Sequence, residues 1–374
     1  MDIKIPAAAA EPDVPLAQQL RSDNEALHGA AHGITRDTYG AGEQRAHELM
    51  ASTARRLGLE VSTDAALNLY LTLPGRDRAA PALMTGSHLD SVPRGGNYDG
   101  AAGVVAGLSI LAGWIAAGMQ PQCDVTVMGV RAEESAWFPL SYIGSKSAFG
   151  LLGADALEIL RLDTRRSLRY RHAQVLGNYA HSGATPRSHR HDAVAALAEV
   201  IARLQQDWAQ MEAQGHELTL TFGQVYTDAQ QADISKVSGQ VSFGVDVRSR
   251  SVDSLQRMER HLLDAVAAAE QKHGVRFALG ERTGSQPAHM DAALQDELQA
   301  AAERLRLAHR RLPSGAGHDA ALFANQGIPT AMLFIRNGNG SHNPDEAMAL
   351  DDFAAGTRAL AQVMAARAGL APKG

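Results

Sequence analysis

Hydrophobic positions along the first part of the chain alternate between helical and extended spacing. Apolar residues recur at helical intervals within residues 15–60. Short apolar runs at 69–73, 82–85 and 125–130 predict strands, and the run 101–117, rich in small residues, predicts a helix. Near the C-terminus, an apolar run at 329–335 predicts another strand and residues 351–368 another helix. Strands that alternate with helices favour an α/β core with a mostly parallel sheet.

The middle of the chain has a different order of predicted strands and helices. We expect strands at 168–177, 217–226, 239–248 and 274–281, and helices at 191–213 and 252–272. This βαββαβ order is typical of a ferredoxin-like unit. The sequence therefore predicts a small domain over residues 168–284, inserted into a larger α/β domain formed by residues 1–167 and 285–374.

Composition narrows the functional class. Of the 374 residues, 45 % are hydrophobic and 20 % are charged, as in ordinary globular proteins. The formal net charge of −6 offers no basic surface for nucleic acid or an anionic membrane. The single cysteine, Cys123, excludes an intrachain disulfide, and the N-terminus lacks the pattern of a secretory signal. We expect a cytoplasmic protein without a membrane span.

Five polar segments follow predicted strands or lie in glycine-rich loops, where the functional residues of α/β folds gather. They are residues 86–93, 95–103, 131–135, 313–320 and 338–346. Taken singly, His88 and Asp90 could be ordinary polar residues on the surface, and Asp99 could be a helix N-cap. Together the segments supply the imidazoles and carboxylates that hold divalent cations, beside a free carboxylate that accepts a proton from water.

The same segments resemble a known family. The most specific stretches are Gly86–Asp90, Tyr98–Gly100, Glu133–Glu134, Ala180–Pro186, Asp246–Ser249, Ser314–Ala320 and Ser341–Glu346. They are similar to M20-type metallohydrolases of the aminoacylase and carboxypeptidase clan. Within it, the chain most resembles the branch of N-carbamoyl-L-amino acid hydrolases, allantoate amidohydrolases and β-ureidopropionases, from Gly33 to Phe353.

This resemblance implies a two-metal site and a reaction. It implies His88, Asp99, Glu134 and His342 as metal ligands, with Asp99 bridging two divalent ions. The ions are Zn or Mn, with Co or Ni as alternatives. Glu133 is implied as the general base. The implied activity is hydrolysis of the ureido C–N bond of an N-carbamoyl-L-amino acid or a related ureido acid.

The resemblance also implies residues that contact substrate. In the inserted domain, which acts as a lid and joins a homodimer in this family, His181 is the implied oxyanion donor and Arg248 the partner of the substrate carboxylate. Ser235 stands where the family often has asparagine, and His318 is expected to line the pocket.

One family motif is absent. The strand that reads approximately Leu-His-Ile-Glu-Gln-Gly, whose histidine completes the metal site, is missing between the glutamate pair and the inserted domain. His172, Glu158 and Asp163 are the candidates to replace that ligand. Two alternatives to the amidohydrolase therefore stay open: an inactive or one-metal relative that binds a ligand or persists as a dimer, and an aminoacylase or dipeptidase of the same clan.

Overall fold

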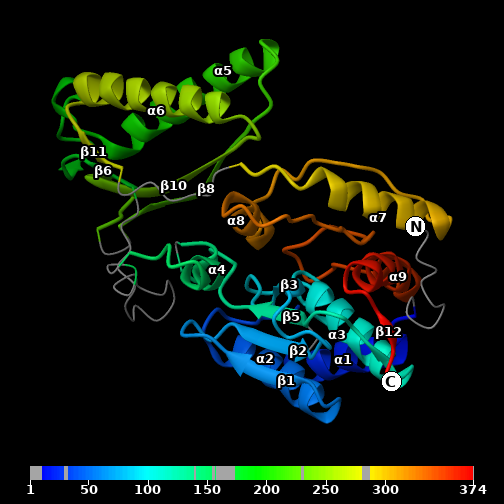
Figure 1. The fold of residues 1–374 in the computed structure, drawn as a ribbon. Coiled ribbons are helices and arrows are strands. Elements are labelled where there is room, and N and C mark those ends of the chain that lie inside the picture. The colour runs from blue at the N-terminus through cyan, green and yellow to red at the C-terminus, as the bar shows by residue number, and fades with distance from the viewer. Residues whose placement is uncertain are drawn as a thin grey trace. The chain divides into compact units, whose positions relative to one another are not determined.

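The computed structural model describes residues 11–28, 33–138, 140–153, 156, 173–228, 231–279 and 287–373. The chain folds into two compact units (Figure 1). Unit 1 comprises Met1–Arg169, His289–Leu312 and His318–Gly374, and unit 2 comprises Tyr170–Ala288 and Pro313–Gly317. Helices and strands occur in both, so the fold is mixed α/β. No helix in the described part of the chain is long and apolar enough to cross a membrane.

The main sheet of unit 1 has four strands in the order β1-β2-β5-β3. The strands are β1 (Glu60–Thr63), β2 (Leu69–Leu73), β3 (Leu83–His88) and β5 (Val125–Val130). Only β3 and β5 are parallel, and the β1–β2 and β2–β5 pairs are antiparallel. The predicted mostly parallel sheet is therefore wrong for the described strands. The short connection 64–68 reverses the chain and makes β1 and β2 antiparallel, whereas the crossover through a helix makes β3 and β5 parallel.

Seven helices of unit 1 lie among the described residues. They are α1 (Val14–His28), α2 (Ala41–Arg56), α3 (Ala101–Ala116), α4 (Ile143–Ala148), α7 (Ala292–Arg304), α8 (Asp319–Asn325) and α9 (Leu350–Arg367). The crossover helix α3 is almost wholly buried. A Cβ at Gly107 would lie 2.9 Å from Val127 and 3.0 Å from Thr85, so this glycine lets α3 approach β3 and β5 closely. Close packing of this helix fixes the strand ends that carry the polar segments.

Two further parts of unit 1 lie outside the main sheet. A small ribbon pairs β4 (Met119–Gln120) with β12 (Ala371–Pro372). The run 329–335, predicted as a strand, is not one: it pairs with no described strand, and the Phe334 side chain is 49 % exposed. An apolar run becomes a strand only where another strand offers hydrogen bonds, which its own sequence does not reveal.

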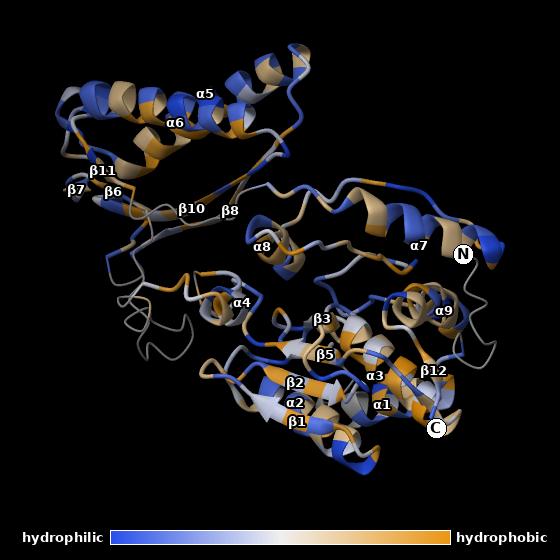
Figure 2. Ribbon diagram, in the orientation of Figure 1, coloured by the Kyte–Doolittle hydropathy of each residue, from blue (hydrophilic) through white to orange (hydrophobic). Residues whose placement is uncertain are grey.

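Unit 2 contains a four-stranded antiparallel sheet in the order β11-β6-β10-β8. The strands are β6 (Ala173–Leu176), β8 (Thr219–Thr227), β10 (Gln240–Arg248) and β11 (Arg276–Ala278). The helices α5 (Ala193–Ala213) and α6 (Val252–His273) bury Leu204 and Met258 in one core with Phe243 of β10. Their mixed colouring in Figure 2 reflects one apolar and one polar side. A short ribbon of β7 (Ala180–His181) and β9 (Lys236–Val237) completes the unit, together with a 3-10 turn, η3 (Arg187–His189).

Candidate metal centre

Five of the predicted site residues meet in unit 1. His88 ends β3, Asp99 precedes α3, and Glu133 and Glu134 follow β5. Because β3 and β5 are parallel neighbours, with His88 opposite Val130, their carboxyl ends bring these side chains to one edge of the sheet. His342 arrives from a loop near the C-terminus.

Asp99 lies between the two imidazoles. Its Oδ1 is 3.8 Å from His88 Nε2, and its Oδ2 is 3.2 Å from His342 Nε2. The same His342 nitrogen is 3.3 Å from Glu134 Oε1. Two three-residue groups have ligand atoms within 4.8 Å of one another: His88 with Glu133 and Glu134, and Asp99 with Glu134 and His342. Each Asp99 oxygen thus faces a different histidine, as a bridging carboxylate requires.

The buried carboxylate of Asp90 organises the residues around it. Its Oδ1 lies 3.3 Å from His88 Nδ1, which directs the opposite nitrogen, Nε2, toward Asp99. The two Asp90 oxygens also accept the backbone N–H groups of Glu133 and Glu134, each at 3.1 Å. The Thr38 hydroxyl donates to Oδ2 at 2.6 Å. Such a partner fixes the ring orientation of a ligating histidine.

The turn that carries the glutamate pair is held by further side chains. Glu43 Oε1 accepts the backbone N–H of Ala132 at 3.0 Å, and Asn68 Oδ1 accepts that of Arg131 at 2.9 Å. Ala132 has a positive φ of 55°, a conformation that such anchors sustain. Every backbone N–H from residue 131 to residue 134 therefore donates to a side chain.

Gly100 sets the distance between Asp99 and His88. Its φ is +67°, which favours glycine, and a Cβ there would lie 2.5 Å from the imidazole and the carbonyl oxygen of His88. Only a residue without a side chain lets the loop bring Asp99 this close to His88.

Charge in the cluster is dominated by buried carboxylates. Burial raises the pKa of Glu133 well above its usual value, and Asp319 and Glu134 add to the rise against the opposing charge of His88. Burial likewise raises the pKa of Asp319 to about 6, although His88 and the Ser145 hydroxyl, which donates to it at 2.6 Å, oppose the shift. Hydrogen bonds to Asp99 and Glu134 raise the pKa of His342 to about 10. This excess of negative charge, with nitrogen and oxygen donors facing one another, fits divalent cations.

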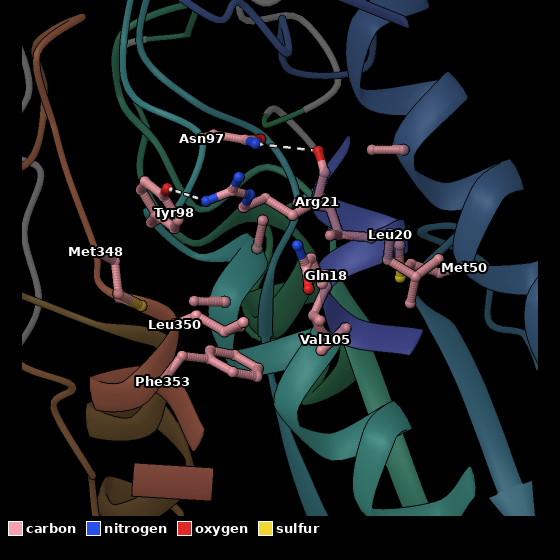
Figure 3. Close-up of a pocket in the computed structure, with 15 residues that line it drawn as sticks. Gln18, Leu20, Arg21, Met50, Asn97, Tyr98, Val105, Met348, Leu350 and Phe353 are labelled. Carbon is pink, nitrogen blue, oxygen red and sulfur yellow. Dashed lines mark hydrogen bonds between the residues drawn. The ribbon is translucent and has the colours of Figure 1, made fainter. Parts of the chain in front are cut away.

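A small apolar cavity lies beside this site in unit 1. It has a volume of about 50 Å³ and is lined by residues of α1, α2, α3 and the segment before and within α9. Figure 3 shows Leu20, Met50, Val105 and Phe353 along its wall. At its polar end, the Arg21 guanidinium donates to the Tyr98 hydroxyl at 3.0 Å. The cavity thus reaches the residue next to Asp99.

Comparison with known proteins identifies the family. Residues 84–366 match the model of Peptidase family M20/M25/M40. The chain belongs to this family. The resemblance seen in the sequence is therefore confirmed.

Several M20-family and amidase relatives are similar over nearly the whole chain. Allantoate amidohydrolase of Escherichia coli (strain K12) is 27 % identical, over 89 % of this chain and 93 % of the relative. N-carbamoyl-L-amino acid amidohydrolase of Geobacillus stearothermophilus is 28 % identical, over 92 % and 96 %. The crystal structure of an amidase of the hydantoinase/carbamoylase family from Burkholderia vietnamiensis is 25 % identical and superposes with a TM-score of 0.85, covering 96 % of this chain and 98 % of that one.

Four further predicted residues of this M20-family chain are not among the five. His318 is the N-cap residue of α8, and its ring meets Phe334 edge-on, with 5.7 Å between ring centroids. His181, Ser235 and Arg248 belong to unit 2. The N–H of Gly183 donates to His181 Nδ1 at 3.1 Å, so in the neutral ring Nε2 carries the proton.

The remaining two residues of unit 2 have acidic partners close in sequence. Ser235 donates to Asp233 through its hydroxyl at 2.5 Å, and Arg248 Nε donates to Asp246 Oδ2 at 2.7 Å. Both Ser235 and Arg248 are on exposed positions of the unit. Among the described residues, Asp246 bonds to Arg248 through Nε alone, which leaves the other guanidinium nitrogens to serve an anion.

The sequence does not reveal every residue that surrounds the site. Glu43 was not predicted, because a charged residue within a helix resembles a solvated one. Asp319 lies inside the polar segment 313–320, but its type and spacing assigned it no role. The candidate replacement ligands His172, Glu158 and Asp163 lie outside the described residues.

Proposed function

We propose that this protein is a metal-dependent amidohydrolase that cleaves the ureido C–N bond of an N-carbamoyl-L-amino acid or a related ureido acid. The observation that carries the proposal is the placement of Asp99 between His88 and His342, with the glutamate pair beside it. The relatives named for N-carbamoyl-L-amino acids and allantoate support the choice of a ureido substrate. The products are an amino acid, carbon dioxide and ammonia.

The ligand set suits two divalent ions, Zn or Mn, with Co or Ni as alternatives. Asp99, Glu134 and His342 would hold one ion, and His88 with the second oxygen of Asp99 would hold the other. Ions held there lower the pKa of a water molecule and polarise the substrate carbonyl. The residues that orient these ligands, above all Asp90, belong to the same unit as the ligands.

Glu133 acts as the general base. It is buried, and its backbone is held by Asp90, so its carboxylate has a defined direction beside the ligand Glu134. Burial raises the pKa of Glu133, which gives the carboxylate a stronger hold on a proton than an exposed glutamate has. It removes the proton from the attacking water and delivers it to the departing nitrogen.

Unit 2 supplies the contacts to substrate. His181 has its Nε2–H available as a donor to the negative charge that develops on the carbonyl oxygen, because Nδ1 is occupied by Gly183. The planar guanidinium of Arg248 pairs with the substrate carboxylate, and Ser235 and His318 contribute to the pocket. We assign the ferredoxin-like residues 168–284 to a lid and homodimerisation domain, and residues 1–167 and 285–374 to the metal-binding domain.

Metal content and ammonia release test the proposal together. The protein is purified with Mn²⁺ or Zn²⁺ supplied, its metal is measured by elemental analysis, and ammonia is followed with N-carbamoyl-L-amino acids and allantoate. We expect about two ions per chain and ammonia release that Glu133→Gln abolishes without loss of metal. One ion or none, without ammonia release, would establish the inactive relative. Hydrolysis of N-acetyl amino acids alone would move the protein to the aminoacylase branch.

A further inference from the structure

One loop near the C-terminus carries one side chain that is exposed to solvent and one that is buried. Backbone hydrogen bonds of 2.7 and 3.1 Å between Gly338 and Ala347 close the loop. His342 lies on it with a positive φ of 64°, and its side chain is 55 % exposed. Glu346, four residues later, is 8 % exposed. The buried glutamate, not the exposed histidine, therefore anchors the loop.

The Glu346 carboxylate grips the backbone of the loop that contains Asp99. Its Oε2 accepts the N–H of Tyr98 at 3.0 Å and that of Asp99 at 3.3 Å. A Cβ at residue 96 would overlap the Glu346 side chain, so Gly96 is what lets the carboxylate lie against this loop. Residues 247 positions apart in sequence are joined in this way.

Arg36 holds the backbone of Asp99 on its carbonyl side. Its Nη2 donates to the carbonyl oxygen of Asp99 at 3.0 Å, and its Nε donates to that of Leu89 at 2.6 Å. The guanidinium is fully buried, and its charge acts on both Asp99 and Glu346. The buried glutamate thus has a compensating cation, as a buried charge requires.

We propose that Glu346 is a positioning residue of the metal centre, which fixes the bridging Asp99 through its backbone and holds the loop that delivers His342. This inference rests on the proposed function, because it concerns the same metal ligands. Glu346 touches neither metal nor substrate in this role. Its contribution is that two ligands from distant parts of the chain keep one geometry before any ion arrives. An oxygen acceptor, rather than a negative charge, is what the two N–H groups need.

Two substitutions at one position separate the acceptor from the charge. Glu346→Gln keeps a carbonyl oxygen for the N–H groups of Tyr98 and Asp99, whereas Glu346→Leu keeps the bulk and removes the acceptor. Glu60→Gln, at an exposed ion pair with Arg78, serves as the matched control. The dissociation constant for Mn²⁺ is measured by competition with a chelating dye, and thermal melting in EDTA reports the stability of the metal-free protein.

Loss of a group that orients a metal ligand weakens metal binding by about 10–100-fold. We expect that loss in Glu346→Leu, a change within about threefold in Glu346→Gln, and none in Glu60→Gln. If the Glu346→Leu variant has the same dissociation constant for Mn²⁺ as the unmodified chain, the inference is overturned, even if the variant melts at a lower temperature. Equal losses in the Gln and Leu variants also overturn it, because charge would then be the cause. An unmodified chain that binds no Mn²⁺ refutes the proposed function itself, and this inference with it.

Discussion

The carboxylate of Asp90 accepts the backbone N–H of Glu133 at 3.1 Å. Its second oxygen accepts the N–H of Glu134 at the same distance, and its first also faces His88. One buried side chain just after β3 therefore orients His88, the predicted ligand that ends this strand, and the glutamate pair that follows the neighbouring strand β5. The geometry of the centre depends on two acceptor oxygens at this position.

Asp90→Asn leaves only one of those oxygens. The amide group would face an N–H donor or the His88 ring, so the turn and the ring lose their alignment. We expect metal affinity to fall by about 10–100-fold, with a comparable fall in kcat/KM for a ureido substrate. Isothermal titration with Mn²⁺ measures the first quantity. Asp352→Asn, on an exposed pair with Arg336, is the control, and equal affinities for the two variants would refute the role of Asp90.

His47 makes the stability of unit 1 sensitive to acid. Its ring is buried, and neither nitrogen has a hydrogen-bond partner among the described residues. Burial, and after it the charge of Arg131, lowers the pKa of His47 to about 3, while the charge of Asp90 acts in the opposite direction. The folded pKa lies below the unfolded value of 6.5, so the unfolded state binds a proton that the folded state does not. Stability from this group is present above pH 6.5 and is lost as the pH falls toward 3.

His47→Leu removes this dependence. Between the two pKa values, the unmodified protein loses about 1.4 kcal/mol of unfolding free energy per pH unit through His47. We expect the variant to gain about 2 kcal/mol relative to the unmodified protein on going from neutral pH to about pH 5. Urea unfolding at a series of pH values measures the difference. Curves that stay parallel over that range would show that His47 is protonated in the folded state.

Leu20→Ala enlarges the apolar cavity beside α1. Leu20 is 1 % exposed and lines that cavity, so loss of most of its side chain makes the cavity larger. We expect a loss of about 3–5 kcal/mol in unfolding free energy, because a site next to a void collapses poorly. Leu151→Ala, at a 46 % exposed position, should cost less than about 1 kcal/mol. Similar melting temperatures for both variants would contradict this account.

Gly100→Ala tests the contact between the Asp99 loop and His88. The substitution adds backbone strain of about 1–3 kcal/mol and an overlap with the imidazole. Gly58→Ala provides the matched control, since Gly58 also has a positive φ, of 78°, but a Cβ there meets nothing within 4 Å. We expect both variants to lose stability and only Gly100→Ala to lose metal affinity, as measured by dye competition. Loss of affinity in neither variant would show that the loop tolerates the added carbon.

Sequence patterns predicted the local elements better than their pairing. The polar segments that end at His88 and begin at Glu133 stood out because each adjoins an apolar strand, and the parallel pairing of β3 and β5 brings them together. The prediction of a mostly parallel sheet was wrong for pairs such as β2 and β5, since an apolar run carries no information about its neighbour's direction. The predicted strand at 329–335 was wrong because an apolar run does not show whether another strand will pair with it. The sequence assigned no role to Glu43, nor to Glu346 within the polar segment 338–346, because both act on backbone groups that only the folded chain brings near.

All backbone N–H groups from Arg131 to Glu134 are already used in hydrogen bonds, and this limits what the turn can contribute to catalysis. Its successive amides all donate to Asn68, Glu43 and Asp90, so none points toward a substrate. Hydrolases that hold a tetrahedral intermediate with consecutive main-chain amides rely on donors that are free before the substrate binds. In this protein the turn positions the carboxylates of Glu133 and Glu134 and contributes no such donor. In the proposed mechanism, the charge that develops on the carbonyl oxygen is therefore left to bound cations and to side-chain donors, and not to the backbone of this turn.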